Sequence, residues 1–344
     1  MPDGILSDLT VLDISENLPG PFFTQSLVDL GARVIKIERP TGDSARASSP
    51  GLFQAVNRGK ESIRLDLKDD PHRESLTALL QNADVLVDGF RPGVLNRLGL
   101  DPTGLRKKYP RLIVVSIVGY NLESKLVMEP GHDITYAAYS GVLSIAGPDP
   151  TKPVWAPGIP VGDLAASSTA LASTLAAVYS RERTGVGCRI VVPIADALAY
   201  LLNPRLGVYH ANGLVEVGAM RNASQSLPAY GVFLCRDGQP IALGALEDHF
   251  WKALVHELDI TTSVQDGWMK YEGRRDDHEA VNNTLAKAIA DRKSEELLIC
   301  LQGADVPCAP ILSPFEALNA FNVATGAEPE QKYFPFPATF VDDV

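Results

Sequence analysis

Leu9-Thr10-Val11-Leu12-Asp13-Ile14 is the stretch that decides the fold class of this chain. It is a short apolar run followed by a turn at Pro19 to Pro21, a helix-spaced set of apolar side chains, and a second run, Arg33-Val34-Ile35-Lys36-Ile37. Similar runs occur farther along the chain, again separated by segments of helical spacing, at 62–66, 85–87 and 112–117. Short apolar strands that alternate with helices predict an α/β fold with a parallel, doubly wound sheet.

A dinucleotide is the ligand first expected of such a sheet. The turn after the first run reads Glu16-Asn17-Leu18-Pro19-Gly20-Pro21, which lacks the GxGxxG pattern. Without those glycines the turn cannot lay a pyrophosphate across backbone amides in the usual way. The sequence therefore argues against a dinucleotide oxidoreductase.

Basic side chains gather in the polar loops of the first hundred residues. Arg39, Arg58, Lys60 and Arg91 lie in or beside segments rich in turn-forming Pro and Gly, in a chain that is otherwise acidic. This local reversal of charge predicts a site for a polyanion, such as the phosphates of coenzyme A or of a nucleotide, held by side chains. The alternative is that each is a solvated surface charge.

The segment Gly131-His132-Asp133-Ile134 places two ionisable residues just before an apolar run of helical spacing. A helix N-terminus favours a neutral imidazole and a carboxylate, and its free N–H groups can bind an oxyanion, so it suits proton transfer. The alternative is that Asp133 is an ordinary N-cap. Asp163 opens a second helix, rich in Ala and Ser and running to about Arg183, and has the same two interpretations.

Composition limits the class of protein. The 344 residues exceed what one core usually organises, and they favour two domains. A net charge of −11 argues against nucleic acid or an anionic membrane as the partner. We find no apolar run of membrane-spanning length and no signal peptide at Met1 to Gly4, so we expect a cytoplasmic protein. Cysteines and histidines lack metal-ligand spacing, so no metal site is expected.

The later part of the chain has a different pattern. Two β-type runs, Tyr230 to Cys235 and Pro240 to Leu243, flank Asp237-Gly238, which predicts a hairpin. Helical spacing follows near 249–258 and 278–290. We therefore expect a large domain over 1–205, which carries the predicted polyanion site, and a small α+β domain with its linkers over 206–310, followed by the C-terminal segment 311–344.

An ordered series of motifs resembles the family III (CaiB/BaiF) coenzyme A transferases and the α-methylacyl-CoA racemases. The resemblance implies a Rossmann-like large domain, a small domain, return of 311–344 to the large domain, and two chains interlocked as a homodimer. It also implies an acyl-CoA thioester as substrate, with no further cofactor. The motifs are Leu12-Asp13-Ile14, Leu30 to Glu38, Asn57-Arg58-Gly59-Lys60, Gly89-Phe90-Arg91-Pro92-Gly93, Gly131-His132-Asp133-Ile134, Val161-Gly162-Asp163-Leu164 and Gly244-Ala245-Leu246-Glu247.

Two chemistries occur in the family that the chain resembles. Its transferases use the aspartate matched by Asp133 to form an acyl anhydride and then a coenzyme A thioester. Its racemases move the α-proton of the thioester with a His and an Asp, matched by His132 and Asp163, and carry an acidic residue matched by Glu247. The presence of His132 and Glu247 favours a racemase.

An α-proton next to a thioester is very weakly acidic, so its transfer needs a base, an acid on the opposite face and donors to the enolate oxygen. By resemblance, His132 and Asp163 exchange the first two roles and Glu247 orients the imidazole. Trp155 is a candidate for shaping the acyl pocket. Three hypotheses stay open: a racemase or epimerase of 2-methylacyl-CoA, a family III coenzyme A transferase, and a non-catalytic binder of coenzyme A thioesters.

Overall fold

The computed structural model describes residues 4–147, 158–325, 332–338 and 340. Its chain forms two compact units. Unit 1 comprises Met1–Ala146, Pro153–Val208 and Tyr333–Val344, and unit 2 comprises Gly147–Lys152 and Tyr209–Lys332. The sequence analysis places the boundaries at 205/206 and 310/311, whereas the units change at 208/209 and 332/333.

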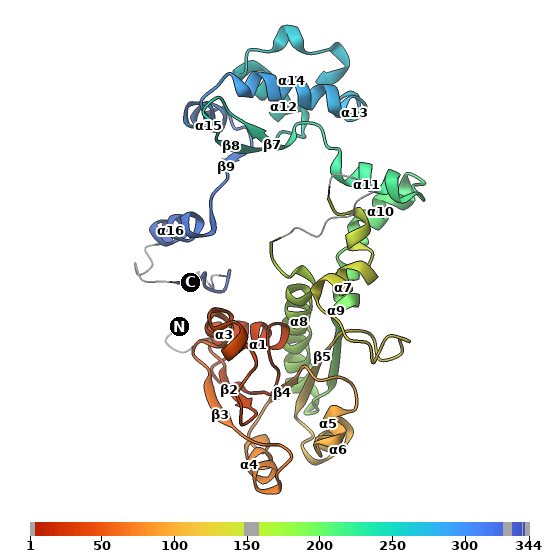
Figure 1. The fold of residues 1–344 in the computed structure, drawn as a ribbon, viewed down its shortest axis with the longest axis vertical. Coiled ribbons are helices and arrows are strands. Elements are labelled where there is room, and N and C mark those ends of the chain that lie inside the picture. The colour runs from red at the N-terminus through yellow and green to blue at the C-terminus, as the bar shows by residue number, and fades with distance from the viewer. Residues whose placement is uncertain (1–3, 148–157, 326–331, 339, 341–344) are drawn as a thin grey trace. The chain divides into compact units, whose positions relative to one another are not determined.

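Unit 1 contains a six-stranded sheet in the order β3-β2-β1-β4-β5-β6, with every neighbouring pair parallel (Figure 1). This is the strand order of a Rossmann-like sheet, in which the order reverses between β1 and β4. The predicted parallel sheet is therefore confirmed. The strands are β1 (Thr10–Asp13), β2 (Arg33–Glu38), β3 (Glu61–Arg64), β4 (Val85–Asp88), β5 (Ile113–Val118) and β6 (Arg189–Pro193).

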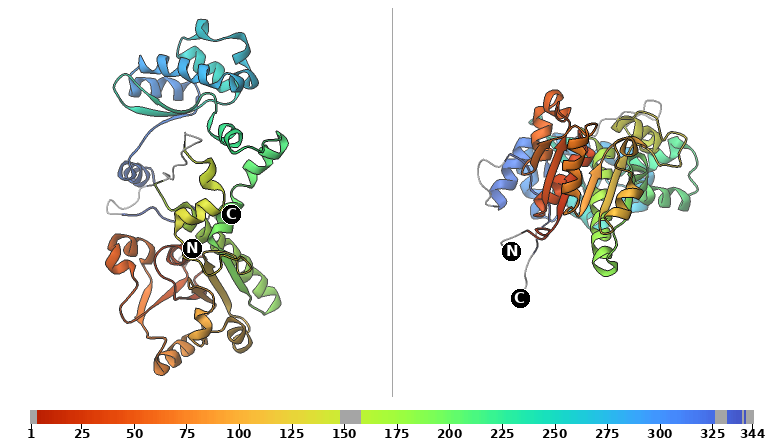
Figure 2. Two further views of the ribbon diagram at one scale, coloured as in Figure 1. Left: turned by 45° about the vertical axis from the view of Figure 1, so that its right-hand side comes forward. Right: turned by 90° about the horizontal axis from the view of Figure 1, so that it is seen from below.

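Helices cover both faces of this sheet, as Figure 2 shows. On one face, α1 (Pro19–Asp29) and α8 (Val161–Thr184) share a buried apolar cluster with the strands. On the other, α4 (Asp70–Leu80), α5 (Val94–Arg97) and α6 (Pro102–Lys108) do the same. The remaining helices of unit 1 are α2 (Ala45–Ser48), α3 (Pro50–Asn57), α7 (Asp133–Tyr139), η1 (Val142–Ile145) and α9 (Ile194–Tyr200), and α10 (Asn203–Ala211) leads into unit 2.

The edge strand β6 was not predicted from the sequence. Its run Arg189-Ile190-Val191-Val192-Pro193 pairs with β5, and Pro193 precedes α9 as its N-cap. Proline is tolerated at this place because an edge strand leaves one side of its backbone unpaired. The sheet thus continues past the long helix α8, which returns the chain to the sheet edge.

Helix α8 is long and apolar enough to cross a membrane, although no such run was expected from the sequence. It has 24 residues and a mean hydropathy of 1.3 in its most apolar window, which suffices for a membrane span by length and composition. In the structure it packs on β5 and β6 and on α1. Near its end, buried Arg181 donates to Asp84 at 2.8 Å. The helix therefore serves as a core helix of unit 1.

Two buried ion pairs lie at the carboxyl ends of β1 and β2. Lys60 Nζ lies 3.1 Å from Asp13 Oδ2, and Lys36 Nζ lies 3.0 Å from Asp43 Oδ2, with all four side chains at most 1% exposed. Lys60 also donates to Thr24 Oγ1 on α1 at 2.7 Å. These bonds join the first strand to α1 and to the segment that leads into β3.

Unit 2 contains a three-stranded antiparallel sheet in the order β7-β8-β9 and a helical layer. The predicted hairpin is confirmed as β7 and β8. One face of the sheet packs on helices α12, α14 and α15 in a single buried cluster. The elements are α11 (Val217–Gln225), β7 (Tyr230–Leu234), β8 (Pro240–Gly244), α12 (Asp248–Glu257), η2 (Thr261–Ser263), η3 (Asp266–Met269), α13 (Tyr271–Asp276), α14 (His278–Ala290), α15 (Ser294–Gly303), β9 (Cys308–Pro310) and α16 (Pro314–Thr325).

Replacing Lys60 with Met tests the buried pair. The change leaves the Asp13 carboxylate buried without its countercharge, so we expect a loss of about 3–5 kcal/mol in the free energy of unfolding, measured by urea denaturation. Arg33→Met is the matched control, because Arg33 and Glu61 form an exposed pair and the expected loss is below about 1 kcal/mol. Equal losses in the two variants would contradict a stabilising role for the buried pair.

Candidate active site

His132 lies at the start of α7, as the sequence predicts. Its backbone is extended, and Thr135 Oγ1 accepts a hydrogen bond from the His132 N–H at 2.9 Å, which fixes the first turn of the helix. The His132 side chain is exposed. The imidazole is therefore accessible to a ligand.

Asp133 and Asp163 meet at the N-terminus of α8. Asp133 Oδ1 accepts hydrogen bonds from the N–H groups of Gly162 at 2.7 Å and Asp163 at 3.1 Å. The Asp133 carboxylate thus caps a helix that begins 28 residues later in the chain. Helix N-termini favour a negative charge at this place. Asp133 is therefore not the N-cap of its own helix, where His132 holds that position; its carboxylate instead binds the N-terminus of α8, beside the second candidate residue, Asp163.

The carboxyl group of Asp163 is half-buried beside this carboxylate. Burial, and then the negative charge of Asp133, raise the pKa of Asp163 from 3.8 to about 7. A carboxyl group with this pKa can both accept and return a proton near neutral pH. Asp133 and Asp163 therefore form a carboxyl pair within unit 1, and with His132, which directly precedes Asp133, they are the candidate acid–base site.

Tyr136 is a member of this site that the sequence analysis does not single out. Its ring is buried one turn after Asp133 and lies where side chains at Gly119 and Gly131 would stand, since a Cβ at Gly131 would come within 2.4 Å of the ring. Burial, and then Asp163, raise the pKa of the Tyr136 phenol to about 12, whereas Arg91 lowers it. Tyr136 thus stays neutral and can donate a hydrogen bond. The signal in the sequence is the pair of glycines.

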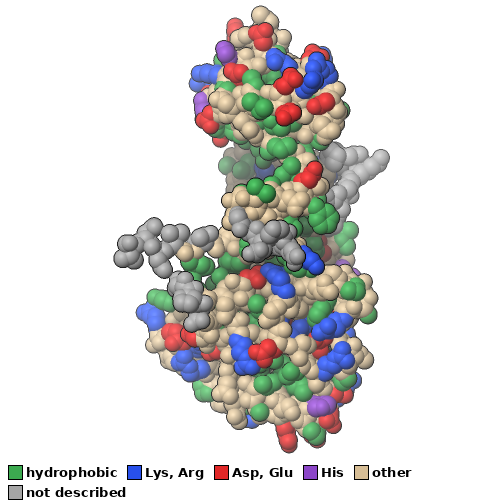
Figure 3. Space-filling view, turned by 90° about the vertical axis from the view of Figure 1, so that its left-hand side faces the viewer, with side chains coloured by type: hydrophobic (Ala, Val, Ile, Leu, Met, Phe, Trp, Pro, Cys, Tyr) green, Lys and Arg blue, Asp and Glu red, His purple; other side chains and the backbone are tan. Residues whose placement is uncertain are grey.

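The structure separates the four predicted phosphate-binding residues. Arg39 and Arg91 are exposed, and the guanidinium group of Arg91 forms no hydrogen bond or ion pair with the residues described. Arg39 donates to Glu16 at 2.6 Å and Arg58 to Asp29 at 2.6 Å, so both guanidinium groups are partly engaged. Figure 3 shows Lys and Arg among Asp and Glu on one face of the molecule, without a single basic patch.

Lys60 requires a correction. Its side chain is 1% exposed, and its ammonium group contacts four protein oxygens, those of Asp13, Pro21, Thr24 and Asn57. An ammonium group has three N–H donors, so none remains for a phosphate. Lys60 stabilises the fold and does not offer its charge to a ligand.

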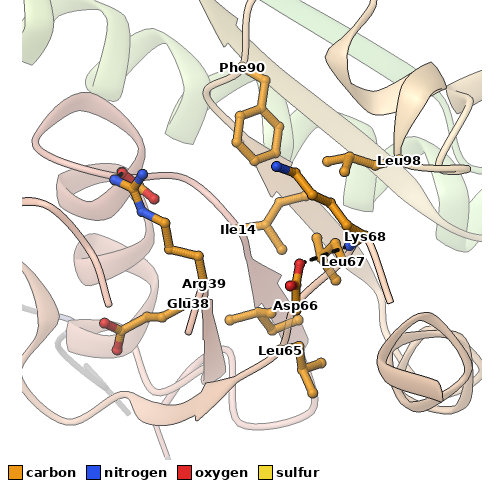
Figure 4. Close-up of a pocket in the computed structure, with 11 residues that line it drawn as sticks. Ile14, Glu38, Arg39, Leu65, Asp66, Leu67, Lys68, Phe90 and Leu98 are labelled. Atoms are coloured by element: carbon orange, nitrogen blue, oxygen red, sulfur yellow. Dashed lines mark hydrogen bonds and ion pairs between the residues drawn. The ribbon is translucent and has the colours of Figure 1, made fainter. Parts of the chain in front are cut away.

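A pocket of about 170 Å³ opens at the carboxyl edge of the sheet (Figure 4). Its lining comes from the ends of β1, β2, β3 and β4, where the strand order reverses, and such switch points bind ligands in α/β proteins. Lys68 extends toward the ring of Phe90, and Arg39 lies on the other side. The lining residues are Ile14, Glu16, Ile37, Glu38, Arg39, Leu65, Asp66, Leu67, Lys68, Phe90 and Leu98.

Of these lining residues, the sequence analysis selects only Arg39 as a binding residue. Phe90 and Lys68 are missed because their segments are separated in sequence and meet only at the sheet edge. Phe90 directly precedes Arg91, and Arg91 acts on the phenol of Tyr136. The pocket and the acid–base site therefore lie on neighbouring parts of unit 1.

Glu247 belongs to unit 2, where it is exposed and forms the N-cap of α12. Buried Arg274 donates to the carbonyl of Leu246 and to Asp248 at 3.1 Å, which fixes the backbone on either side of Glu247. Its role beside His132 stays a prediction. Trp155 lies outside the described residues, and among those described no group of His, Cys, Asp and Glu is arranged to hold a metal ion.

Fold and site together define an α/β protein with a pocket at the carboxyl edge of a parallel sheet. The family model for CoA-transferase family III matches residues 6–327. The chain therefore belongs to CoA-transferase family III.

Relatives in this family have different activities. The chain is 34% identical over 326 residues to the acetyl-CoA:oxalate CoA-transferase of Acetobacter aceti, covering 92% of this chain and 83% of that protein. It is 31% identical over 323 residues to human alpha-methylacyl-CoA racemase, covering 91% and 79%. A solved CAIB/BAIF family protein from Brucella suis superposes with a TM-score of 0.85 at 26% identity, covering 99% of this chain and 93% of that one. The names include transferases and a racemase, so they do not select one reaction.

The raised pKa of Asp163 has a consequence for stability. The folded protein keeps a proton that the unfolded chain releases between about pH 4 and about pH 7, so the Asp163 contribution declines as pH rises through this window. We expect Asp163→Asn to be more stable than the native protein by about 2 kcal/mol at about pH 8 and to match it near about pH 4. Urea denaturation at both pH values measures this, and an equal difference at both would contradict the raised pKa.

Proposed function

We propose that the protein racemises or epimerises 2-methylacyl-CoA thioesters by moving the α-proton between His132 and Asp163. The observation that carries this proposal is the Asp163 carboxyl group, whose pKa is raised to about 7, beside Asp133, the residue that directly follows the exposed His132. One group removes the proton as a base, and the conjugate acid of the other returns a proton to the opposite face of the α-carbon. The reverse reaction exchanges these roles.

The intermediate of this reaction is an enolate, whose oxygen needs hydrogen-bond donors. Tyr136, with a pKa of about 12, supplies a neutral phenol in the same site. Asp133 accepts two N–H bonds at the N-terminus of α8, where it contributes to the raised pKa of Asp163. Glu247 of unit 2 is proposed to orient the imidazole of His132, as the resemblance to racemases implies.

We further propose that the pocket at the carboxyl edge of the sheet holds the adenine of coenzyme A. Ile14, Phe90 and Leu98 supply apolar surface, and Arg39 and Lys68 supply positive charge at the sides (Figure 4). A base binds by stacking on an aromatic ring, and phosphates bind to Arg and Lys. Arg91 is exposed between this pocket and the acid–base site, where it can contact the pyrophosphate.

Deuterium incorporation tests the reaction. The purified protein is incubated with a 2-methylacyl-CoA in deuterated water, and we expect deuterium at the α-carbon without an acceptor acid, with either epimer reaching the same mixture. His132→Ala and Asp163→Asn should each reduce racemisation by about 10²- to 10⁴-fold. Each variant keeps one base and can still exchange the proton of a single epimer. Binding of thioesters without exchange by the native protein would instead support the non-catalytic hypothesis.

A CoA transferase is the second candidate, favoured by the printed names of several relatives and by the position of Asp133 at a helix N-terminus. A transferase should form an acyl or coenzyme A adduct on Asp133 that mass spectrometry detects on its peptide. The proposed racemase should form none. Transfer of coenzyme A to a free acid by His132→Ala would contradict the racemase proposal.

Coenzyme A affinity tests the pocket. We expect Phe90→Ala to lose about 1–3 kcal/mol of binding free energy in calorimetry because the base loses its stacking surface. Phe315→Ala is the matched control, since Phe315 is exposed on α16. Arg91→Ala should bind more weakly and respond less to added salt. Strong binding of NAD with none of coenzyme A would contradict the assignment.

We also propose that two chains associate as an interlocked homodimer. Supporting this, the outer flank of α8 and neighbouring residues of β6 and α9 line an apolar groove of about 740 Å³. If a second copy of the chain covers this groove, a charged side chain in place of the small residue Ala172 should prevent association. We expect Ala172→Glu to be monomeric in analytical ultracentrifugation, whereas a monomeric native protein would contradict the proposal.

A further inference from the structure

Asp88 is a buried carboxyl group that the proposed reaction does not use. It is the last residue of β4, beside the place where the strand order reverses, and it is 2% exposed. Its Oδ2 accepts a hydrogen bond from Ser116 Oγ on β5 at 2.6 Å, and its Oδ1 accepts one from the N–H of Phe90 at 3.1 Å. The carboxyl group therefore links the neighbouring strand to the turn that carries the aromatic wall of the pocket.

The surroundings of Asp88 provide little compensation for its charge. Burial raises its pKa to about 6, while the bonds from Ser116 and Phe90 and the charge of Arg189 on β6 lower it. Among the described residues, Asp88 forms no ion pair. On its other side Asp13 of β1 is bonded to Thr24 and Lys60, and α5 and α6 contribute Leu95 and Leu105 to the buried cluster on this face of the sheet.

A buried carboxylate without an ion pair costs free energy, which hydrogen bonds to its oxygens partly offset. One of the two bonds to Asp88 comes from the backbone of Phe90, so the carboxylate helps to position that residue. The turn after β4 has only Gly89 between Asp88 and Phe90, and the exposed Gly89 gives it no side chain to pack. The bond from the Phe90 N–H to Asp88 therefore fixes this backbone relative to the sheet, together with the packing of the Phe90 ring on the buried cluster.

We propose that Asp88 is a positioning residue of the coenzyme A pocket, whose ionised carboxylate fixes the turn at Phe90 so that affinity for coenzyme A falls when Asp88 takes up a proton. This inference rests on the proposed pocket. The ionised carboxylate is the stronger acceptor, because charge-assisted hydrogen bonds exceed neutral ones. Protonation weakens the bond to the Phe90 N–H and loosens the wall on which the base stacks.

The experiment is calorimetric titration of coenzyme A into the whole protein between about pH 5 and about pH 8. Because the phosphates of the ligand titrate in the same range, the readout is the difference between the native protein and Asp88→Asn. We expect Asp88→Asn to bind about three- to tenfold more weakly than the native protein at about pH 8, and the two curves to meet toward about pH 5. Asp291→Asn, at an exposed position in unit 2, is the matched control and should follow the native curve.

Ser116→Ala is a second variant, which keeps the titrating carboxyl group of Asp88 but changes its pKa. It removes a donor to the ionised carboxylate, so the pKa of Asp88 rises and the loss of affinity should begin at a higher pH than in the native protein. If the missing hydroxyl of Ser116→Ala acted only by leaving a small cavity, affinity for coenzyme A would fall equally at every pH. This difference separates positioning by charge from general damage to the fold.

Phe90→Ala separates failure of this inference from failure of the pocket. If Phe90→Ala binds coenzyme A as the native protein does, the pocket assignment is wrong and the inference with it. If Phe90→Ala loses affinity while Asp88→Asn keeps the native affinity and pH dependence, the pocket stands and the role of Asp88 is overturned. The role of Asp88 would also be overturned if affinity for coenzyme A fell at the same pH in Ser116→Ala as in the native protein.

Discussion

Two carboxyl groups share the N-terminus of one helix, and the account of this protein depends on that interaction. The first turn of α8 offers two N–H groups, both bonded to Asp133. A helix end stabilises one negative charge well, but a second carboxylate beside it is repelled and partly desolvated. Asp163 is therefore the group of the pair that carries a proton near neutral pH.

Several features of unit 1 maintain this arrangement. Gly162 allows the approach, since a Cβ there would lie 3.0 Å from Asp133 Oδ1. Ser167, buried one turn later, donates to the carbonyl of Pro19 at 2.7 Å and so fixes α8 against the start of α1. Helix α8 also packs on β5 and β6. The position of the carboxyl pair is thus determined by the core of the sheet rather than by a loop.

The sheet could be predicted from the sequence because its buried strands are short apolar runs separated by helical spacing. The edge strand β6 was missed because Arg189 and Pro193 bound a run of only three apolar residues. The acid–base residues were found by their positions before two helices, although nothing in sequence shows that Asp133 caps the helix of Asp163. Lys60 was misassigned because a lysine beside glycines is typical of a surface loop. The pocket was missed because Lys68 and Phe90 approach each other only through the strand order.

The titration of Asp163 tests the central claim most directly. With ¹³C-labelled aspartate and assignment by Asp163→Asn, NMR follows this carboxyl group in the free protein and in an Asp133→Asn variant. The account predicts a pKa of about 7 in the native protein and a lower value in Asp133→Asn, because the repelling charge is gone. A native pKa near the ordinary 3.8, or one unaffected by Asp133→Asn, would contradict it.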